Sequence, residues 1–143
     1  MNQVWEGRHL LRVLTAAFYW FLFIGYLAAL YWVSARQTVP TVDIEGLDKV
    51  AHAVAYFGLC VVSRLAFGTL SSRRWLATLW AVAVTLLYGA IDEWHQSFVP
   101  GRSSDLYDWI ADAVGGVAGG TLFLVFWTRR RVRQAIAAKS TPD

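Results

Sequence analysis

The sequence predicts an all-α membrane protein, a bundle of four transmembrane helices with both termini in the cytoplasm. Three observations support this fold class. The 143 residues are 57% hydrophobic and only 16% charged, and the mean hydropathy of +0.41 lies above the usual range of soluble domains. Four apolar stretches approach the roughly 20 residues that a helix needs to span the hydrocarbon core. Most charged residues lie between these stretches or at their ends.

The first two predicted spans differ in how cleanly apolar they are. Residues 13–33 contain no charge, and this run is too long and too aromatic for the apolar region of a signal peptide. Residues 50–70 are apolar apart from His52, Ser63 and Arg64. Because the long side chain of Arg64 can reach the nearer interface, it does not exclude a span.

The next two predicted spans carry polar residues at the same end. Residues 75–91 form a short apolar run, which we expect to continue as a helix through Gln96. Residues 106–128 form the fourth span and carry Asp108 and Asp112 in its first two turns. Charged groups at this depth are costly in lipid, so they must face protein, water or a counter-ion.

Lysine and arginine predict the orientation, because cytoplasmic loops carry an excess of these residues. One side of the predicted membrane has the larger number, namely Arg8, Arg12, Arg73, Arg74, Arg129, Arg130, Arg131, Arg133 and Lys139. The other side has Arg36, Lys49 and Arg102. We therefore expect a cytoplasmic segment 1–12, a transmembrane domain 13–128 and a basic cytoplasmic tail 129–143, whose last ten residues fray.

Composition also excludes some classes of protein. A pI of about 9.3 invites a nucleic-acid function, but the basic residues lie beside apolar stretches, where they bind an anionic leaflet. We therefore expect the lipid bilayer as a partner, and no nucleic acid. The single cysteine, Cys60, excludes an internal disulfide and a multi-cysteine metal site.

Two polar clusters lie on the second and third predicted helices, near the predicted outer face. Asp48 and His52 are four residues apart, so they share a helix face and can form a general-base pair. At the end of the third helix, Glu93 and Gln96 share one face, and Asp92 shares a face with Gln96.

The third polar cluster begins with Pro100-Gly101-Arg102-Ser103-Ser104-Asp105 and continues to Asp108 and Asp112. The spacing of Asp105, Asp108 and Asp112 places three carboxylates along one helix face. Since these acids repel one another, we expect them to share a proton or a cation. The alternative is structural: Arg102 pairs with Asp105 or Glu93, and the acids cap the fourth helix. Asp112 lies too deep for capping.

The sequence assigns no metal site, and it leaves any cofactor unknown. A hard-cation site formed by Glu93, Asp105, Asp108 and His52 is conceivable, but no tight ligand spacing such as HExxH is present. Ser103 and Ser104 are the only hydroxyl groups that we expect near His52, and no Gly-x-Ser-x-Gly elbow surrounds them.

Two overlapping GxxxG pairs occur in the fourth predicted helix, formed by Gly115, Gly116, Gly119 and Gly120. Small residues at this spacing let a second helix approach closely. The contact can be internal, which we favour, or it can form a homodimer.

The polar residues form the series Asp48-Lys49-x-x-His52, Glu93-x-x-Gln96-x-Phe98-x-Pro100-Gly101-Arg102-x-x-Asp105 and Asp108-x-x-x-Asp112-x-x-Gly115. This series resembles VanZ-like membrane proteins, from about Asp48 to Gly120. The resemblance implies a bacterial inner-membrane protein with four hydrophobic segments. Members of that family often carry Asn where this chain has Asp112. The candidate site that the resemblance implies is Asp48, His52, Glu93, Gln96, Arg102, Asp105, Asp108 and Asp112.

The namesake of the VanZ-like family is linked to resistance against teicoplanin, a glycopeptide antibiotic. We expect an outward-facing polar cleft that recognises, and in its enzymatic version modifies, a lipid-linked envelope precursor or a phospholipid. Arg102 would bind the anion. The catalytic candidates are Asp48, His52, Glu93 and Asp108, and the substrate-binding candidates are Gln96, Arg102, Ser103, Asp105 and Asp112.

Two alternatives to this function stay open. In the first, the protein is a non-enzymatic envelope scaffold, whose polar residues hold the helices together and which presents a surface to a partner. In the second, the protein is a small ion- or proton-coupled carrier with Asp108 and Asp112 as relay groups. Whether the protein is an enzyme is therefore left open by the sequence.

Overall fold

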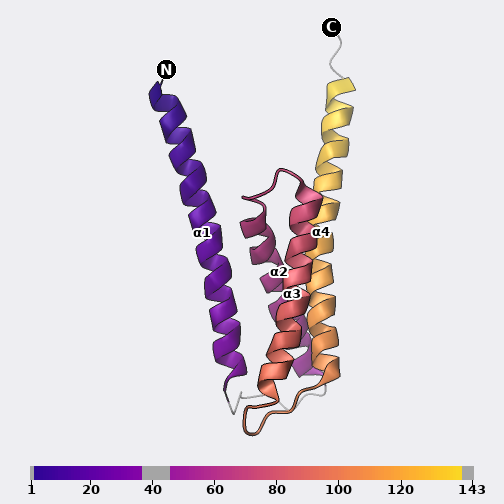
Figure 1. Ribbon diagram of the computed structural model, residues 1–143. Coiled ribbons are helices and arrows are strands. Elements are labelled where there is room, and N and C mark those ends of the chain that lie inside the picture. Colours follow the sequence, from indigo (N-terminus) through magenta and orange to yellow (C-terminus); the bar gives the residue numbers. More distant parts are fainter. Residues whose placement is uncertain (1, 37–45, 140–143) are drawn as a thin grey trace.

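Four helices form the described part of the chain, which is residues 2–36 and 46–139 of a computed structural model (Figure 1). The helices are α1 (Asn2–Ser34), α2 (Leu47–Phe67), α3 (Arg74–Gln96) and α4 (Leu106–Lys139). No strand occurs in these residues. Each helix contains a segment long and apolar enough to cross a membrane. The predicted all-α fold with four spans is confirmed, and the chain is a multi-pass membrane protein.

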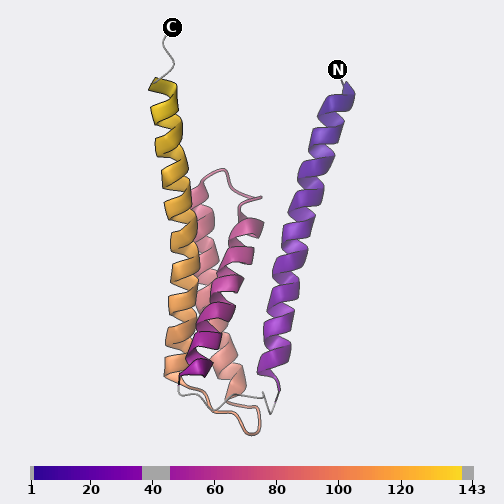
Figure 2. The same cartoon turned by 180° about the vertical axis from the view of Figure 1, so that it is seen from behind.

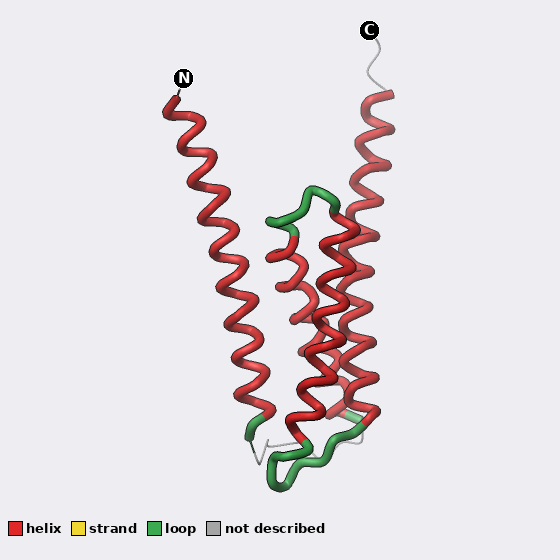
Figure 3. Tube along the Cα trace, in the orientation of Figure 1, coloured by secondary structure: helices red, strands yellow, loops and turns green. Residues whose placement is uncertain are grey.

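The helices run alternately up and down (Figures 1 and 3). The first turns of α1 and the last turns of α4 therefore lie at one end of the molecule, together with the α2–α3 connection. The α3–α4 connection and the start of α2 lie at the opposite end, which we call the site end (Figure 1). Which compartment the site end faces stays a prediction.

The helices α1 and α4 are longer than the spans predicted for them. α1 has 33 residues and α4 has 34, which is about 50 Å at 1.5 Å per residue, whereas the hydrocarbon core is about 30 Å thick. Both helices extend past the α2–α3 connection (Figure 2). The expected fraying is wrong for residues 134–139, which are helical, because the alanine, glutamine and lysine in this segment are good helix formers. Residues 140–143 lie outside the described part.

A glycine determines where α2 begins. Gly46 has φ +80°, a conformation that glycine adopts without steric cost, and the helix starts at the next residue. α2 therefore covers Leu47–Phe67 instead of the predicted 50–70. The earlier start places Asp48 and Lys49 in the first turn of the helix, from which Lys49 reaches the start of α4.

The core of the bundle is the packing of α4 against α2 and α3. Gly115, Gly116, Gly119 and Gly120 are all buried. A Cβ on Gly115 would overlap the Ala53 carbonyl oxygen of α2, and a Cβ on Gly116 would press on Thr85 of α3. The favoured internal contact is the one that forms. A homodimer through these glycines would require the bundle to open.

The α1 helix contacts α2 and, to a small extent, α3, and it makes no contact with α4 among the described residues. Phe23 of α1 is buried in a cluster with Tyr56 and Leu59 of α2. Two tyrosine hydroxyls join α1 to its neighbours. Tyr26 of α1 donates to the Ala55 carbonyl of α2 at 2.9 Å, and Tyr88 of α3 donates to the Leu27 carbonyl of α1 at 2.8 Å.

Candidate functional site

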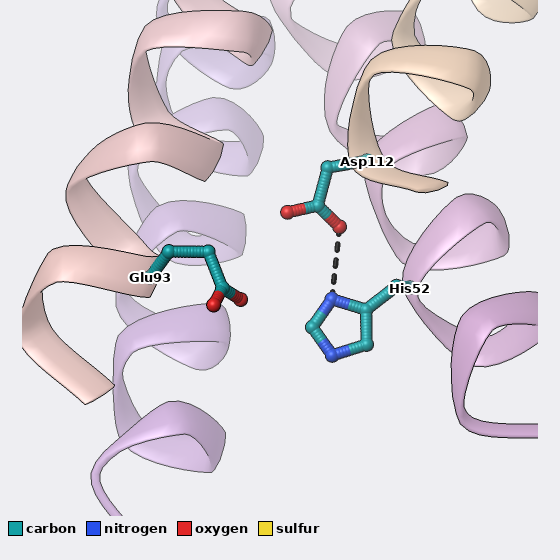
Figure 4. A group of neighbouring side chains, drawn as sticks. All are labelled: His52, Glu93 and Asp112. Carbon is teal, nitrogen blue, oxygen red and sulfur yellow. Dashed lines mark hydrogen bonds and ion pairs between the residues drawn. The ribbon is translucent and has the colours of Figure 1, made fainter. Parts of the chain in front are cut away.

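Three polar side chains from three helices converge at the site end (Figure 4). His52 lies in the second turn of α2, Glu93 in the last turn of α3 and Asp112 in the second turn of α4. A hydrogen bond of 2.9 Å joins His52 Nδ1 to Asp112 Oδ1. The predicted Asp48–His52 pair is therefore wrong, because the imidazole turns toward α4 instead of along its own helix. We call His52, Glu93 and Asp112 the three-helix cluster.

Both carboxylates of the three-helix cluster are buried, and each has one oxygen without a hydrogen-bond partner. Asp112 is 0% exposed and Glu93 is 6% exposed. Glu93 Oε2 accepts a hydrogen bond of 2.8 Å from the Asp105 backbone N–H. Within the described residues, no donor reaches Glu93 Oε1 or Asp112 Oδ2. One ligand atom from each of the three residues lies within 4.8 Å of the other two, so the cluster offers donor atoms of the kinds that bind a metal ion.

Lys49 connects the start of α2 to the start of α4. Its ammonium group donates to Asp105 Oδ2 at 2.7 Å and to Asp108 Oδ1, and it lies 3.0 Å from Asp48 Oδ2. The hydrogen bond from Lys49 lowers the pKa of the Asp105 carboxyl. The expectation that the acidic face of the fourth helix shares a cation is confirmed for Asp105 and Asp108.

Asp105 also begins α4 in the way that its position predicted. Its Oδ1 accepts a hydrogen bond of 2.9 Å from the Tyr107 backbone N–H, which is the contact that a helix N-cap makes. Asp105 and Asp108 therefore hold the start of α4 and bind Lys49. Asp108 is not part of the three-helix cluster.

A cavity of about 200 Å³ lies beside the three-helix cluster. Its walls come from α1, α2, α3 and the α3–α4 connection: Leu30, Val33, Ser34, Asp48, Ala51, His52, Ala55, Tyr56, Asp92 and Arg102. Asp48, His52 and Arg102, which the sequence placed in one cleft, thus share this cavity. Within the described chain Arg102 forms no ion pair, so the alternative in which it pairs with Asp105 or Glu93 is wrong.

Of the five predicted substrate-binding residues, Arg102 lines this cavity, and Gln96, Ser103, Asp105 and Asp112 do not. Gln96 is buried, and its Nε2 donates to Asp92 Oδ2 at 3.0 Å, as their spacing predicted. Ser103 and Ser104 are exposed and do not line the cavity.

The sequence did not identify several residues of the site. Ser34, Tyr56 and Asp92 line the cavity, and Lys49 binds three carboxylates. Lys49 could have been identified from the sequence, because it is a lysine placed among acids at the start of a membrane helix. Ser34 comes from α1, and no spacing in the sequence relates it to the polar clusters, so only the packing of α1 against α2 identifies it.

A helical multi-pass membrane protein with a polar site buried between its helices is the class that the fold and the site define. The chain matches the family model described as VanZ/LLP1 over residues 8–127. It therefore belongs to that family, which confirms the resemblance and extends it into the first span. The VanZ name is linked to glycopeptide resistance. No curated protein and no solved structure matches the chain.

Proposed function

We propose that the protein binds a lipid-linked or phosphate-bearing component of the bacterial cell envelope in the cavity at its site end. In this proposal the site end faces outward, and His52 acts as a general base if the bound component is modified. The observation that carries the proposal is that Arg102 and His52 line the same cavity. The cavity therefore combines an anion-binding group with a base.

The charges around the cavity leave Arg102 available for a ligand. Lys49 is engaged by three carboxylates, whereas Arg102 has no ion pair among the described residues and its buried Nε has no partner there. A guanidinium group binds phosphate oxygens with two parallel hydrogen bonds. A phosphate group would therefore satisfy Arg102 better than any described side chain does.

The remaining walls suit the apolar part of an amphiphile. Leu30 and Val33 of α1 and Ala51 and Ala55 of α2 line the cavity beside the polar residues. A volume of about 200 Å³ holds a head group and not a complete lipid. In this proposal, the lipid chains leave the cavity along α1 and enter the bilayer.

The pair formed by His52 and Asp112 suits base chemistry. A carboxylate on one ring nitrogen fixes the tautomer and raises the basicity of the other nitrogen. Because Nδ1 contacts Asp112, Nε2 is the nitrogen that remains for a ligand in the cavity. Asp112 thus takes the role that the sequence had assigned to Asp48.

The test compares Arg102→Gln with Arg36→Gln. Arg36 is a matched control, because its guanidinium group stacks on Trp32 and it does not line the cavity. Lipids that co-purify with each protein are quantified by mass spectrometry. We expect a phosphate-bearing lipid enriched over the bulk membrane, retained by Arg36→Gln and reduced about tenfold by Arg102→Gln, since charged hydrogen bonds contribute about 1.5–3 kcal/mol. Identical lipid profiles in all three proteins would contradict the proposal.

A second candidate function is a non-enzymatic scaffold, and one observation favours it. The polar contacts Lys49–Asp108, His52–Asp112 and Glu93 with the Asp105 backbone all join different parts of the bundle. His52→Ala and Glu93→Gln separate the two functions. Normal folded yield with loss of the bound lipid supports the binding site, and a collapse of yield with unchanged lipid in the surviving protein supports the scaffold.

A further inference from the structure

We propose that the three-helix cluster of His52, Glu93 and Asp112 binds one divalent transition-metal cation, such as Mn²⁺ or Zn²⁺. This site goes beyond the proposed lipid binding and does not depend on it; with the ion bound, His52 is its ligand and not the general base described above. The sequence pointed away from a metal because no two ligands are close along the chain. The fold removes that objection, since each ligand comes from a different helix.

The geometry of the three-helix cluster suits a single ion. Figure 4 shows the Glu93 and Asp112 carboxylates and the His52 ring around one space between α2, α3 and α4. The ligand atoms lie within 4.8 Å of one another. Nitrogen and oxygen ligands bind such metals at about 2.0–2.2 Å, so two ligands on one ion lie at most about 4.4 Å apart. Small side-chain rotations would bring all three atoms into the coordination sphere.

Two unsatisfied carboxylate oxygens favour a cation independently of this spacing. Glu93 Oε1 and Asp112 Oδ2 are buried without a partner among the described residues, on side chains at least nine-tenths buried. A buried carboxylate oxygen normally has a hydrogen bond or a cation. The lysine of α2, Lys49, is already bound to three other acids. A divalent cation would satisfy both oxygens and offset both negative charges.

The donor atoms select the class of metal. One imidazole nitrogen with two carboxylate oxygens suits Mn²⁺, Fe²⁺ or Zn²⁺, whereas Mg²⁺ and Ca²⁺ prefer oxygen ligands alone. Three protein ligands leave further coordination positions open. Because His52 also lines the cavity, those positions are accessible to a ligand bound there, and an anion held by Arg102 would be attracted to the same ion.

The experiment uses the full chain, purified in detergent and stripped with a chelator, then titrated with Mn²⁺ and followed by electron paramagnetic resonance. We expect one tightly bound ion per chain and a nitrogen coupling in the pulsed spectrum from the His52 imidazole. Glu93→Gln and Asp112→Asn should each weaken binding tenfold or more. Asp108→Asn is the matched control, because Asp108 lies one turn before Asp112 on α4 and its carboxylate binds Lys49 outside the cluster; this variant should bind Mn²⁺ as the wild type does.

Several outcomes would overturn the metal site. A wild-type spectrum without nitrogen coupling would do so, and this measurement does not depend on any variant folding. Equal affinity in the wild type and Glu93→Gln would also overturn it, as would a loss of binding in Asp105→Asn that Glu93→Gln does not share. Arg102→Gln keeps the two proposals apart, since it should lose the lipid while it still binds Mn²⁺.

Discussion

At the scale of single residues, the site depends on which carboxylates Lys49 and His52 bind. Lys49 forms ion pairs with Asp48, Asp105 and Asp108, and His52 forms a hydrogen bond with Asp112. Spacing along one helix favoured Asp48 for His52. That prediction failed because a residue four positions away on the same helix is only one possible partner for His52. The helix α4 packs against α2 and supplies another, the fully buried carboxylate of Asp112.

Asp105→Asn should lower the thermal midpoint of unfolding in detergent at neutral pH. The amide can still cap α4, but the substitution removes one of the three charged acceptors of Lys49. The pKa of Asp105 is lowered in the folded protein, below the usual value of about 3.9. The contribution of its charge is therefore complete above that value and is lost as the pH falls through the lowered pKa.

The measurement is the difference between wild type and Asp105→Asn in thermal scans at a series of pH values. We expect a constant difference above about pH 5 and a difference that disappears in stronger acid. A difference that persists at the lowest pH would show that the carboxylate acts through something other than its charge.

At the scale of elements, α4 determines how the bundle packs. One face of its middle turns consists of glycines, which have no side chains. The backbone of α2 therefore comes into direct contact with this face of α4. The same rotation of α4 directs Asp112 at His52 and presents Asp108 to Lys49. Close packing and site assembly are thus properties of one helix face.

Gly115→Ala should destabilise the bundle by about 1–3 kcal/mol, because the added methyl group overlaps the Ala53 carbonyl and the helices must separate. Gly25→Ala is the control, since a Cβ at Gly25 meets nothing within 4 Å. That change should be neutral or slightly stabilising, because alanine favours a helix over glycine. Both proteins are unfolded in mixed micelles of increasing denaturing detergent. Equal stability of the two variants would contradict this packing.

The helices themselves could be predicted well, and their ends less well. Hydropathy identifies the part of a helix that lies in lipid, so all four spans were found. It contains no information about where a helix ends in water. That is why the first turns of α1 and the last turns of α4 were missed, and why the start of α2 depended on the backbone of Gly46.

At the scale of the whole molecule, the end of the bundle on which the site lies could be predicted, but the contacts within the site could not. Patterns along the chain placed Asp48, His52, Glu93 and Arg102 near one membrane face. Which groups touch depends on how far each helix is rotated about its axis, and no spacing within one helix fixes the rotation of its neighbours. The cavity wall formed by Ser34 of α1 is the clearest example.

The predicted orientation can be tested with single cysteines in a Cys60→Ala background. Ser104→Cys lies at the site end and Ser72→Cys lies in the α2–α3 connection at the other end, and both serines are exposed. We expect a membrane-impermeant maleimide to label Ser104→Cys in intact spheroplasts and Ser72→Cys only after permeabilisation, because arginines favour the cytoplasmic side. The reverse pattern would place the site in the cytoplasm and contradict the proposed envelope ligand.

The position of α4 after the other three helices has a consequence for biosynthesis. When the first three helices have left the ribosome, His52 is in the bilayer without Asp112, and Lys49 lacks two of its three acids. Polar groups in lipid are stabilised only when partners arrive. A chain made only as far as α3 would thus expose polar groups within the membrane, and these groups find their partners when α4 arrives.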